Sequence, residues 1–157
     1  FIMKKIFSFL KSVILILIVS NCGFKVVDQS KLINFKVDSI SISGDSRVSY
    51  IIKNKLLPYS KNNEKKIIDL DIEIKKNKDI KEKNIKNEIT KFQISIITNV
   101  QYGDDFSEKF AILKKGDYSV TNQYSQTLNN EKKLIKTLSE NLAEELIEKL
   151  MERVGDT

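Results

Sequence analysis

The sequence predicts an α+β fold in which two helices pack on one face of a mostly antiparallel sheet of about four strands. One observation behind this prediction is a row of leucines that recurs every four residues between Leu134 and Leu150, which is typical of an amphipathic helix. Another is the alternation of apolar and polar residues in several segments, which is typical of strands that bury one face. Such elements become stable when the helices cover the apolar face of the sheet.

The first strand is predicted over Phe35–Ser43, where Ile40 and Ile42 share one face and serines share the other. Gly44-Asp45-Ser46 ends this strand, and either Asp45 or Ser46 can cap a helix. Apolar residues then continue at helical spacing to Leu56, and Pro58 ends the helix. The first helix therefore follows the first strand directly.

Two longer alternating segments predict neighbouring strands. Ile68–Lys75 places isoleucine and leucine on one face and charged residues on the other, and Lys91–Tyr102 repeats the alternation over a longer stretch. Asp69 and Asp71 lie two residues apart and thus share the polar face of their strand. This pair is interpreted as a solvent-facing surface rather than as a catalytic acid and base.

Two turn signals divide the next part of the chain. Gly103-Asp104-Asp105 predicts a turn, and Phe106–Ile112 predicts a weaker strand beyond it. Lys115-Gly116-Asp117 is a second turn signal, and Tyr118–Tyr124 is expected to be extended.

The last element is a long helix that opens at Asn129-Asn130-Glu131 and has Gly155 at its C-cap. Glu145 and Lys149 have the spacing of an ion pair on one helix face. The leucine row could instead form a coiled-coil seam, but a spacing of four drifts away from the 3.5-residue repeat of such a seam. Core packing is therefore the preferred interpretation.

The beginning of the chain has the features of a bacterial export signal. Lys4 and Lys5 precede an apolar run from Val13 to Val19, and no acidic residue occurs before Asp28. Lys11 interrupts the apolar stretch too early for a membrane span, which needs about 20 apolar residues. The predicted organisation is a signal peptide over residues 1–21 and one domain over residues 22–157.

The only cysteine, Cys22, lies directly after the apolar run. The segment Val19-Ser20-Asn21-Cys22 resembles the lipobox of bacterial lipoproteins, in which the cysteine thiol carries diacylglycerol as a thioether. Asn21 departs from the small residue that is usual before the cysteine. The alternative is a buried free cysteine. Lipid attachment at Cys22 is the preferred hypothesis, and several acyl chains there would anchor the protein firmly.

The composition excludes several kinds of chemistry. The chain of 157 residues has no histidine, which excludes Ser-His-Asp and Cys-His catalysis and imidazole metal sites. One cysteine excludes an internal disulfide and a multi-thiolate cluster. We expect no enzyme activity, no metal and no cofactor other than the lipid on Cys22. Hydrolysis by carboxylates alone is the enzymatic alternative that stays open.

A lysine-rich segment accounts for much of the net charge of +6. It is predicted to form the tip of a hairpin between two strands. Two interpretations are open: a solvated loop, or an electrostatic site for the phosphate groups of an anionic lipid or lipopolysaccharide. Nucleic acid is not expected, because the segment has no interleaved aromatic residue or arginine and the chain carries an export signal. The segment contains Lys75, Lys76, Lys78, Lys81, Lys83 and Lys86 beside Asp79 and Glu82.

Several segments form a pattern that covers essentially the whole chain after the signal. They are Cys22-Gly23-Phe24, the strand with Ile40 and Ile42, the helix ending near Leu57, Thr90-Lys91-Phe92-Gln93-Ile94, Tyr118 to Tyr124, and Asn141-Leu142-Ala143-Glu144-Glu145-Leu146-Ile147. Together these segments resemble the LptE family of lipopolysaccharide-assembly lipoproteins of the Gram-negative outer membrane.

The resemblance implies two helices on a four-stranded sheet, a lipid on Cys22 and no catalysed reaction. It further implies that the protein plugs the lumen of an LptD-like β-barrel in the outer membrane, supports assembly of that barrel and helps to pass lipopolysaccharide to the outer leaflet. Lys83 and Lys86 are the candidate lipopolysaccharide contacts, although a gapless match of the basic family position falls on Ile85. A second family contact falls on Gln126-Thr127, which offers no basic residue.

A rival hypothesis is a stand-alone, periplasm-facing lipoprotein module that holds an anionic lipid or glycan through the lysine segment. A barrel lumen is polar, so a plug is expected to have outward faces that are mainly uncharged and able to form hydrogen bonds. The predicted outward side chains of this kind are Ser39, Ser41, Gln93, Ser95, Asn99 and Gln101.

Overall fold

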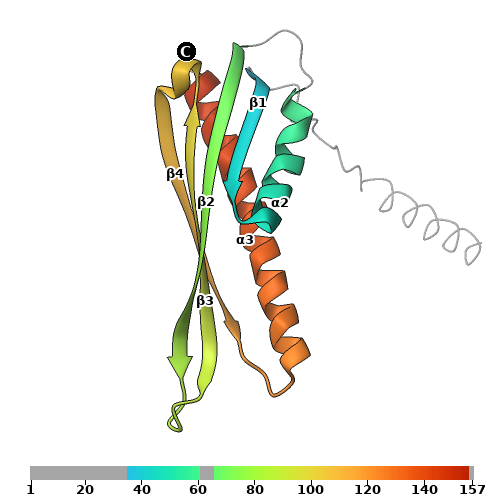
Figure 1. Cartoon of the computed structure of the whole chain (residues 1–157), viewed down its shortest axis with the longest axis vertical. Helices are drawn as coiled ribbons and strands as arrows, with labels where there is room; N and C mark the ends of the chain where they lie inside the picture. The colour runs from blue at the N-terminus through green and yellow to red at the C-terminus, as the bar shows by residue number, and fades with distance from the viewer. Residues whose placement is uncertain (1–34, 61–65, 156–157) are drawn as a thin grey trace, which may run out of the picture.

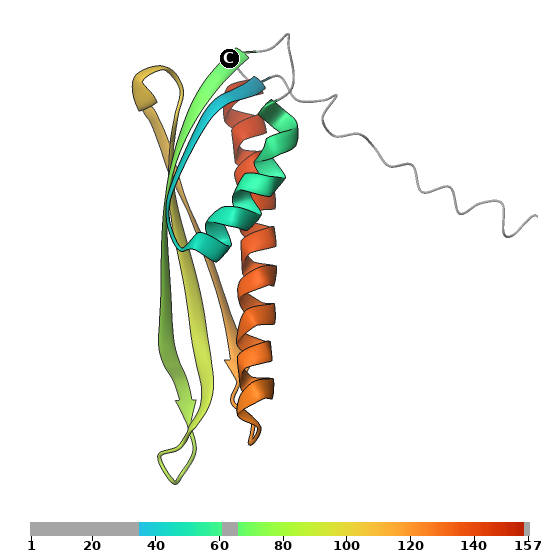
Figure 2. The same ribbon diagram turned by 45° about the vertical axis from the view of Figure 1, so that its right-hand side comes forward.

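The computed structural model describes residues 35–60 and 66–155 as a four-stranded sheet with two helices on one of its faces (Figure 1, Figure 2). The predicted fold class is confirmed. The elements, in chain order, are β1 Phe35–Gly44, α2 Ser46–Leu56, the short 3-10 helix η2 Leu57–Ser60, β2 Lys66–Lys83, β3 Ile89–Tyr102, the 3-10 helix η3 Asp104–Phe106, β4 Glu108–Ser119 and α3 Tyr124–Gly155.

The strands lie in the order β1-β2-β3-β4, and α2 is the crossover between the parallel pair β1 and β2. The other neighbours are antiparallel, so the sheet is mostly antiparallel as predicted. Phe35 pairs with Lys66 and Gly44 pairs with Ile74, so β1 accompanies β2 only as far as Ile74. Beyond that residue the sheet consists of β2, β3 and β4 alone.

The hydrophobic core lies between the sheet and the two helices. α2 contributes Val48, Ile52 and Leu56, the four strands contribute half of the buried apolar residues described, and α3 contributes its leucine row and neighbouring residues. Leu142, Leu146 and Leu150 are fully buried, which confirms core packing as the role of this row. The N-cap of α2 is Asp45, whose carboxylate accepts hydrogen bonds from the backbone N–H groups of Arg47 and Val48 at 3.2 and 3.1 Å.

β2 is longer than the alternation of its first half predicts. The strand continues through the lysine-rich segment to Lys83, and the hairpin turn begins only at Asn84. The prediction of a lysine-rich loop is therefore wrong for Lys75–Lys83. The physical reason is cross-strand pairing, because β3 supplies partners such as Ile94 opposite Lys78 and Phe92 opposite Ile80. These apolar partners stabilise a strand that the lysines alone would not predict.

The predicted turn at Lys115-Gly116-Asp117 is also wrong, since all three residues lie within β4. Gly116 pairs with Ile94 and lies beneath α3. A Cβ atom at Gly116 would lie 2.7 Å from Cδ1 of Leu134. The glycine therefore permits close approach of helix and strand and does not mark a turn.

α3 begins at Tyr124 rather than at Asn129. Side-chain hydrogen bonds organise the preceding turn, because the hydroxyl of Thr127 accepts from the backbone N–H of Thr121 at 2.9 Å. The hydroxyl of Thr121 in turn donates to the backbone carbonyl of Gln123 at 2.9 Å. Toward the other end of the helix, the predicted ion pair between Glu145 and Lys149 is present at 3.3 Å. Glu145 also pairs with Lys114 of β4, which ties α3 to the sheet.

The end of β1 provides a test of the sheet. Gly44 has φ of +108°, and a Cβ atom there would lie 1.9 Å from the carbonyl oxygen of Ile74. Gly44→Ala therefore combines a disfavoured backbone conformation with a collision, and we expect a loss of about 3 kcal/mol of unfolding free energy in urea. The matched control is Gly103→Ala, where φ is +87° and the nearest atom is 4.0 Å away. It should cost only about 1 kcal/mol. Equal losses at the two positions would contradict the described register of β1 on β2.

Candidate functional site

The β2–β3 hairpin extends beyond both helices and forms one end of the molecule (Figure 1, Figure 2). Since β1 stops pairing at Ile74, residues Lys75–Lys83 form a strand with an open edge. Exposed backbone groups along such an edge can pair with another chain, and lysine side chains are a common protection against this. Five of the six lysines singled out in the sequence lie on this strand, and only Lys86 lies in the turn.

Three of these lysines are engaged in ion pairs within the domain. Lys75 contacts Glu73 at 2.9 Å, and the ammonium of Lys78 contacts Glu131 at 2.6 Å. Lys76 pairs with Asp45, the residue that caps α2. Alternation along β2 turns Lys76 and Lys78 toward the face that carries the helices, where these two carboxylates lie. These three ammonium groups are therefore already partly neutralised.

Lys78 is the centre of a small network. Its ammonium lies 4.5 Å from the ring centroid of Phe92 and 5.4 Å from that of Tyr118. The hydroxyl of Tyr118 donates to the same Glu131 oxygen at 2.7 Å. Partial burial opposes ionisation of Glu131, but the hydrogen bonds from Lys78 and Tyr118 outweigh it and lower the pKa of this carboxyl. The network joins β2, β3, β4 and α3.

The Lys76–Asp45 ion pair likewise joins two elements of the fold. Partial burial of Asp45 favours its neutral form, but hydrogen bonds from Lys76 and from the N–H groups of Val48 and Arg47 outweigh it and lower the pKa of Asp45. The pair links the start of α2 to β2 just beyond the end of β1. Lys76 thus supports the helix cap.

The remaining lysines gather toward the tip of the hairpin. Lys83 donates to the side-chain carbonyl of Asn87 at 3.0 Å, whereas Lys81 and Lys86 make no ion pair with the described residues. Lys83 and Lys86 are the two residues that the sequence nominates. The structure adds Lys81 as a candidate contact, because the preceding lysines of the strand are in ion pairs with described residues and Lys81 is not. We call Lys81, Lys83 and Lys86 the tip lysines.

The turn between the strands is held by Asn84. Its side-chain oxygen accepts from the N–H groups of Lys86 and Glu88 at 2.9 and 3.0 Å. Asn87 adopts φ of +64°, a conformation that asparagine tolerates better than most residues. Ile85 is fully exposed in this turn. The tip therefore presents an apolar side chain beside three cationic ones and the acidic Glu88, which accepts a hydrogen bond from the side-chain amide of Asn84 at 2.7 Å.

The second expected contact, Gln126-Thr127, lies in the first turn of α3. This end of α3 and the hairpin tip are at the same end of the molecule (Figure 1). The hydroxyl of Thr127 is occupied by hydrogen bonds with the Thr121–Gln123 segment, and Gln126 is exposed. Cys22, the predicted lipid site, lies outside the described residues.

The face of the sheet that carries no helix is polar but not mainly uncharged as expected. Asn99 donates to Glu73 at 3.0 Å, and Gln93 donates to Asp117 at 2.9 Å, so charged residues of β2 and β4 lie beside the uncharged residues of β3. On the edge strand β1, the hydroxyl and the backbone N–H of Ser39 both donate to Asp69. This contact agrees with a surface role for Asp69.

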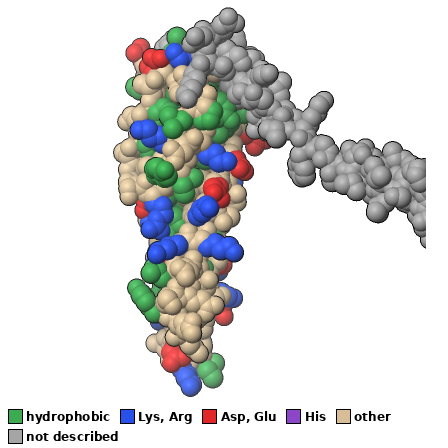
Figure 3. All heavy atoms as spheres, turned by 90° about the vertical axis from the view of Figure 1, so that its right-hand side faces the viewer, with side chains coloured by type: hydrophobic (Ala, Val, Ile, Leu, Met, Phe, Trp, Pro, Cys, Tyr) green, Lys and Arg blue, Asp and Glu red, His purple; other side chains and the backbone are tan. Residues whose placement is uncertain are grey.

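The helix-bearing side carries Lys and Arg side chains along most of its length, interspersed with apolar and acidic ones, rather than in one patch (Figure 3). Among the described residues, no group of three or more acidic, cysteine or histidine side chains is placed to hold a metal ion. Within the same part of the chain, no helix combines the length and apolar character needed to cross a bilayer.

The fold is one found in small lipoproteins. Rare lipoprotein B from Shewanella oneidensis has a TM-score of 0.56 at 11% identity, with 71% of this chain and 92% of that chain covered. A lipoprotein B from Nitrosomonas europaea has a TM-score of 0.57 at 10% identity, covering 82% of this chain and 90% of that chain. A minor lipoprotein from Acinetobacter baumannii gives 0.53 at 14% identity, covering 74% and 89%.

These likenesses establish a shared fold over most of both chains. No family model matches the sequence, and no curated protein matches it. The two helices and the four-stranded sheet that the LptE resemblance implies are therefore confirmed at the level of architecture.

The Lys78–Glu131 network makes a prediction about pH. Because the pKa of Glu131 lies below its ordinary 4.5 in the folded protein, its ionised form contributes stability above that pH and loses it as the pH falls through the lowered pKa. Glu131→Gln should cost about 1 kcal/mol in urea unfolding at pH 7, a modest value because the pair is partly exposed. The difference from the unmodified protein should shrink as the pH falls below 4.5.

Glu148→Gln is the matched control, because Glu148 is exposed on the same helix and makes no ion pair with the described residues. Its stability should follow that of the unmodified protein at every pH. A cost for Glu131→Gln that does not depend on pH would refute the role assigned to this carboxylate.

Proposed function

We propose that this chain is an outer-membrane lipoprotein, acylated at Cys22, that plugs an LptD-like β-barrel, supports its assembly and assists the insertion of lipopolysaccharide into the outer leaflet. The observation that supports this most directly is the coincidence of two features. The only cysteine directly follows an export-type apolar segment, and the domain beyond it has the fold of proteins that are themselves lipoproteins. A non-catalytic role is part of the proposal.

The shape and surface of the domain suit a plug. The molecule is elongated, with the hairpin at one end and the start of β1 at the other (Figure 2). Its helix-free face carries polar side chains from all four strands, and many of them pair with one another across the strands. A water-lined lumen offers such a face hydrogen-bonding partners without requiring a large apolar patch.

The tip lysines supply the part of the proposal that concerns lipopolysaccharide. Ammonium groups attract phosphate as point charges, and each one near an anionic lipid surface contributes about 1 kcal/mol. Because Lys75, Lys76 and Lys78 are paired within the domain, the lysines of this segment that lack an ion pair lie toward the hairpin tip, where they outnumber Glu82 and Glu88. Ile85 lies in the same turn and could contact acyl chains.

Purification of the native complex tests the main proposal. With a C-terminal tag on the full chain, we expect a large barrel protein in stoichiometric amount and an acylated Cys22 in the N-terminal peptide by mass spectrometry. Cys22→Ser should abolish acylation and reduce recovery from membranes, whereas Ser20→Ala should leave both unchanged. Recovery of an acylated monomer that binds lipopolysaccharide without a barrel would instead support the stand-alone module, and an unmodified Cys22 would refute the lipoprotein assignment.

The tip lysines are tested by charge reversal. Lys83→Glu combined with Lys86→Glu should weaken lipopolysaccharide binding by about ten-fold or more, since two attractive charges become repulsive. The control combines Lys53→Glu with Lys109→Glu, two exposed lysines away from the hairpin, and changes the net charge equally. Circular dichroism verifies folding of both variants. Equal binding by the two variants would leave the hairpin tip a solvated turn with no part in recognition.

A further inference from the structure

The outer edge of β1 is open and, over much of its length, uncharged. Among the described residues, β1 pairs only with β2, so its other side has no neighbouring strand. Exposed backbone N–H and C=O groups along such an edge are a template for another chain. Lysines protect the other open edges, since five lie on β2 between Lys75 and Lys83 and three lie on β4. The second half of β1, Ser39–Gly44, contains no charged residue.

A groove runs beside this uncharged part of β1, and we call it the β1 groove. It has a volume of about 420 Å³, and α2 forms its other wall. Ile40 and Ile42 line the strand side, because their pairing with Leu70 and Ile72 turns them toward the helices. Tyr50 lines the helix side and is 69% exposed. The β1 groove therefore places apolar side chains directly beside an open strand edge.

The charge of the β1 groove is positive. Lys53 is the only charged side chain among the described residues that line it, and it makes no ion pair with the described part of the chain. α2 returns from the end of β1 toward its start, so Lys53 lies toward the Ile40 end of the groove (Figure 2). A carboxylate on an incoming chain would find an opposite charge here and no like charge.

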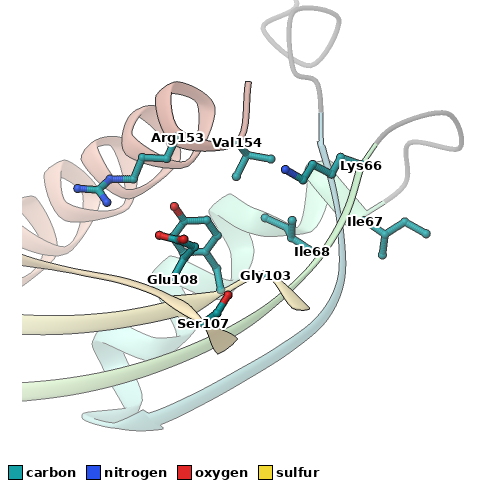
Figure 4. A pocket seen from close by; sticks show the side chains of 9 residues that line it. Lys66, Ile67, Ile68, Gly103, Ser107, Glu108, Arg153 and Val154 are labelled. Carbon is teal, nitrogen blue, oxygen red and sulfur yellow. The ribbon is translucent and has the colours of Figure 1, made fainter. Parts of the chain in front are cut away.

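A second hollow, of about 460 Å³, provides a contrast (Figure 4). It lies between the start of β2 and the end of α3, and Lys66 and Arg153 line it together with Glu108. Because cations and a carboxylate share this hollow, it does not select one sign of ligand charge. Of these two hollows, the β1 groove is the one that combines an uncharged strand edge with a single sign of charge.

We propose that β1 binds an extended segment of a partner protein along Ile40–Gly44, so that the segment adds a strand to the sheet. Its apolar side chains lie in the β1 groove beside Tyr50, and a carboxylate on the same face contacts Lys53. In strand addition, backbone hydrogen bonds provide affinity and alternate side chains provide specificity. The interaction goes beyond the proposed function, since it requires neither the lipid on Cys22 nor lipopolysaccharide.

A second copy of this chain matches the β1 groove less well. Two β1 edges would place Ser39–Gly44 of each copy side by side, and this segment has no carboxylate for Lys53. Asp38 is the only acidic residue of β1, and Lys36 already pairs with it at 3.4 Å. The complementary charge therefore belongs to a chain of different sequence.

A synthetic peptide tests the proposal. The probe is fluorescein-labelled Thr-Glu-Thr-Val-Thr-Val-Thr-amide, in which the glutamate and both valines share one face of a strand. Fluorescence anisotropy measures its affinity for the full chain in detergent micelles. Tyr50→Ala and Lys53→Glu should each weaken binding about five-fold or more. Replacing the glutamate of the peptide by lysine should weaken binding to the unmodified protein and restore it to Lys53→Glu.

Two exposed positions away from the β1 groove provide matched controls. Tyr124→Ala removes a tyrosine that is 80% exposed on α3, and Lys109→Glu reverses an exposed lysine on β4. Both should bind the peptide as the unmodified protein does. Circular dichroism verifies that all four variants are folded.

Backbone methylation distinguishes strand addition from contact through side chains alone. Alternate N–H groups of a strand point to the same side, so only every second one faces β1. Of two peptides, N-methylated either at the threonines or at the glutamate and valines, one should therefore bind about ten-fold more weakly than the other. Hydrogen exchange should slow at Ile40–Ser43 on binding and stay unchanged at Lys75–Lys83.

No binding, equal affinity of the two methylated peptides, or undiminished binding by Lys53→Glu would overturn the proposal. Slower exchange at Lys75–Lys83 alone would do the same. A concentration-dependent dimer that protects the Ile40–Ser43 amides without peptide would assign the edge to a second copy and overturn a partner of different sequence. Because the probe contains neither lipid nor barrel, failure here is independent of the tests of the proposed function.

Discussion

The packing of α3 along the sheet is the constraint on which the rest of the structure depends. β1 pairs with β2 only as far as Ile74, and α2 packs on that part of the sheet. α3 is longer and extends past both of them toward the hairpin (Figure 2). The helix keeps one apolar stripe in contact with the sheet, from Ile135 to Val154. Gly116 lets the helix approach β4, and Glu145 and Glu131 tie its polar flank to Lys114 and Lys78. A strand ribbon without this helix would have an uncovered apolar face.

The stop of β1 at Gly44 creates the two distinct surfaces of the hairpin. On the helix-bearing face, Lys76 and Lys78 are held by Asp45 and Glu131 and stabilise the junctions of helix and sheet. At the open edge and the tip, lysines protect a strand that would otherwise offer its backbone to another chain. One sequence feature therefore combines a structural role near the body of the domain with an accessible cationic tip. The same tip is where a phosphate-bearing ligand would find charges not already neutralised.

Exposed large apolar side chains occur at both ends of the molecule. The hairpin end presents Ile80, Ile85 and Tyr124 beside the tip lysines, and the opposite end presents Leu57, Ile67 and Phe106. β1 begins at this opposite end, at Phe35.

The sequence by itself determined the fold class, most of the strands, a helix cap at Asp45 or Ser46, the leucine row as a core face and the candidate lipid site at Cys22, because alternation, helical periodicity and the lone cysteine are local signals. It did not determine the extent of β2 and β4. Lys78 lies in a strand because Ile94 is its cross-strand partner, and Gly116 lies in a strand because α3 passes over it. The ion pairs of Lys76 and Lys78 join residues 31 and 53 positions apart. Only the tertiary structure brings such partners together, and it alone decides which lysines are neutralised by ion pairs within the described part of the domain.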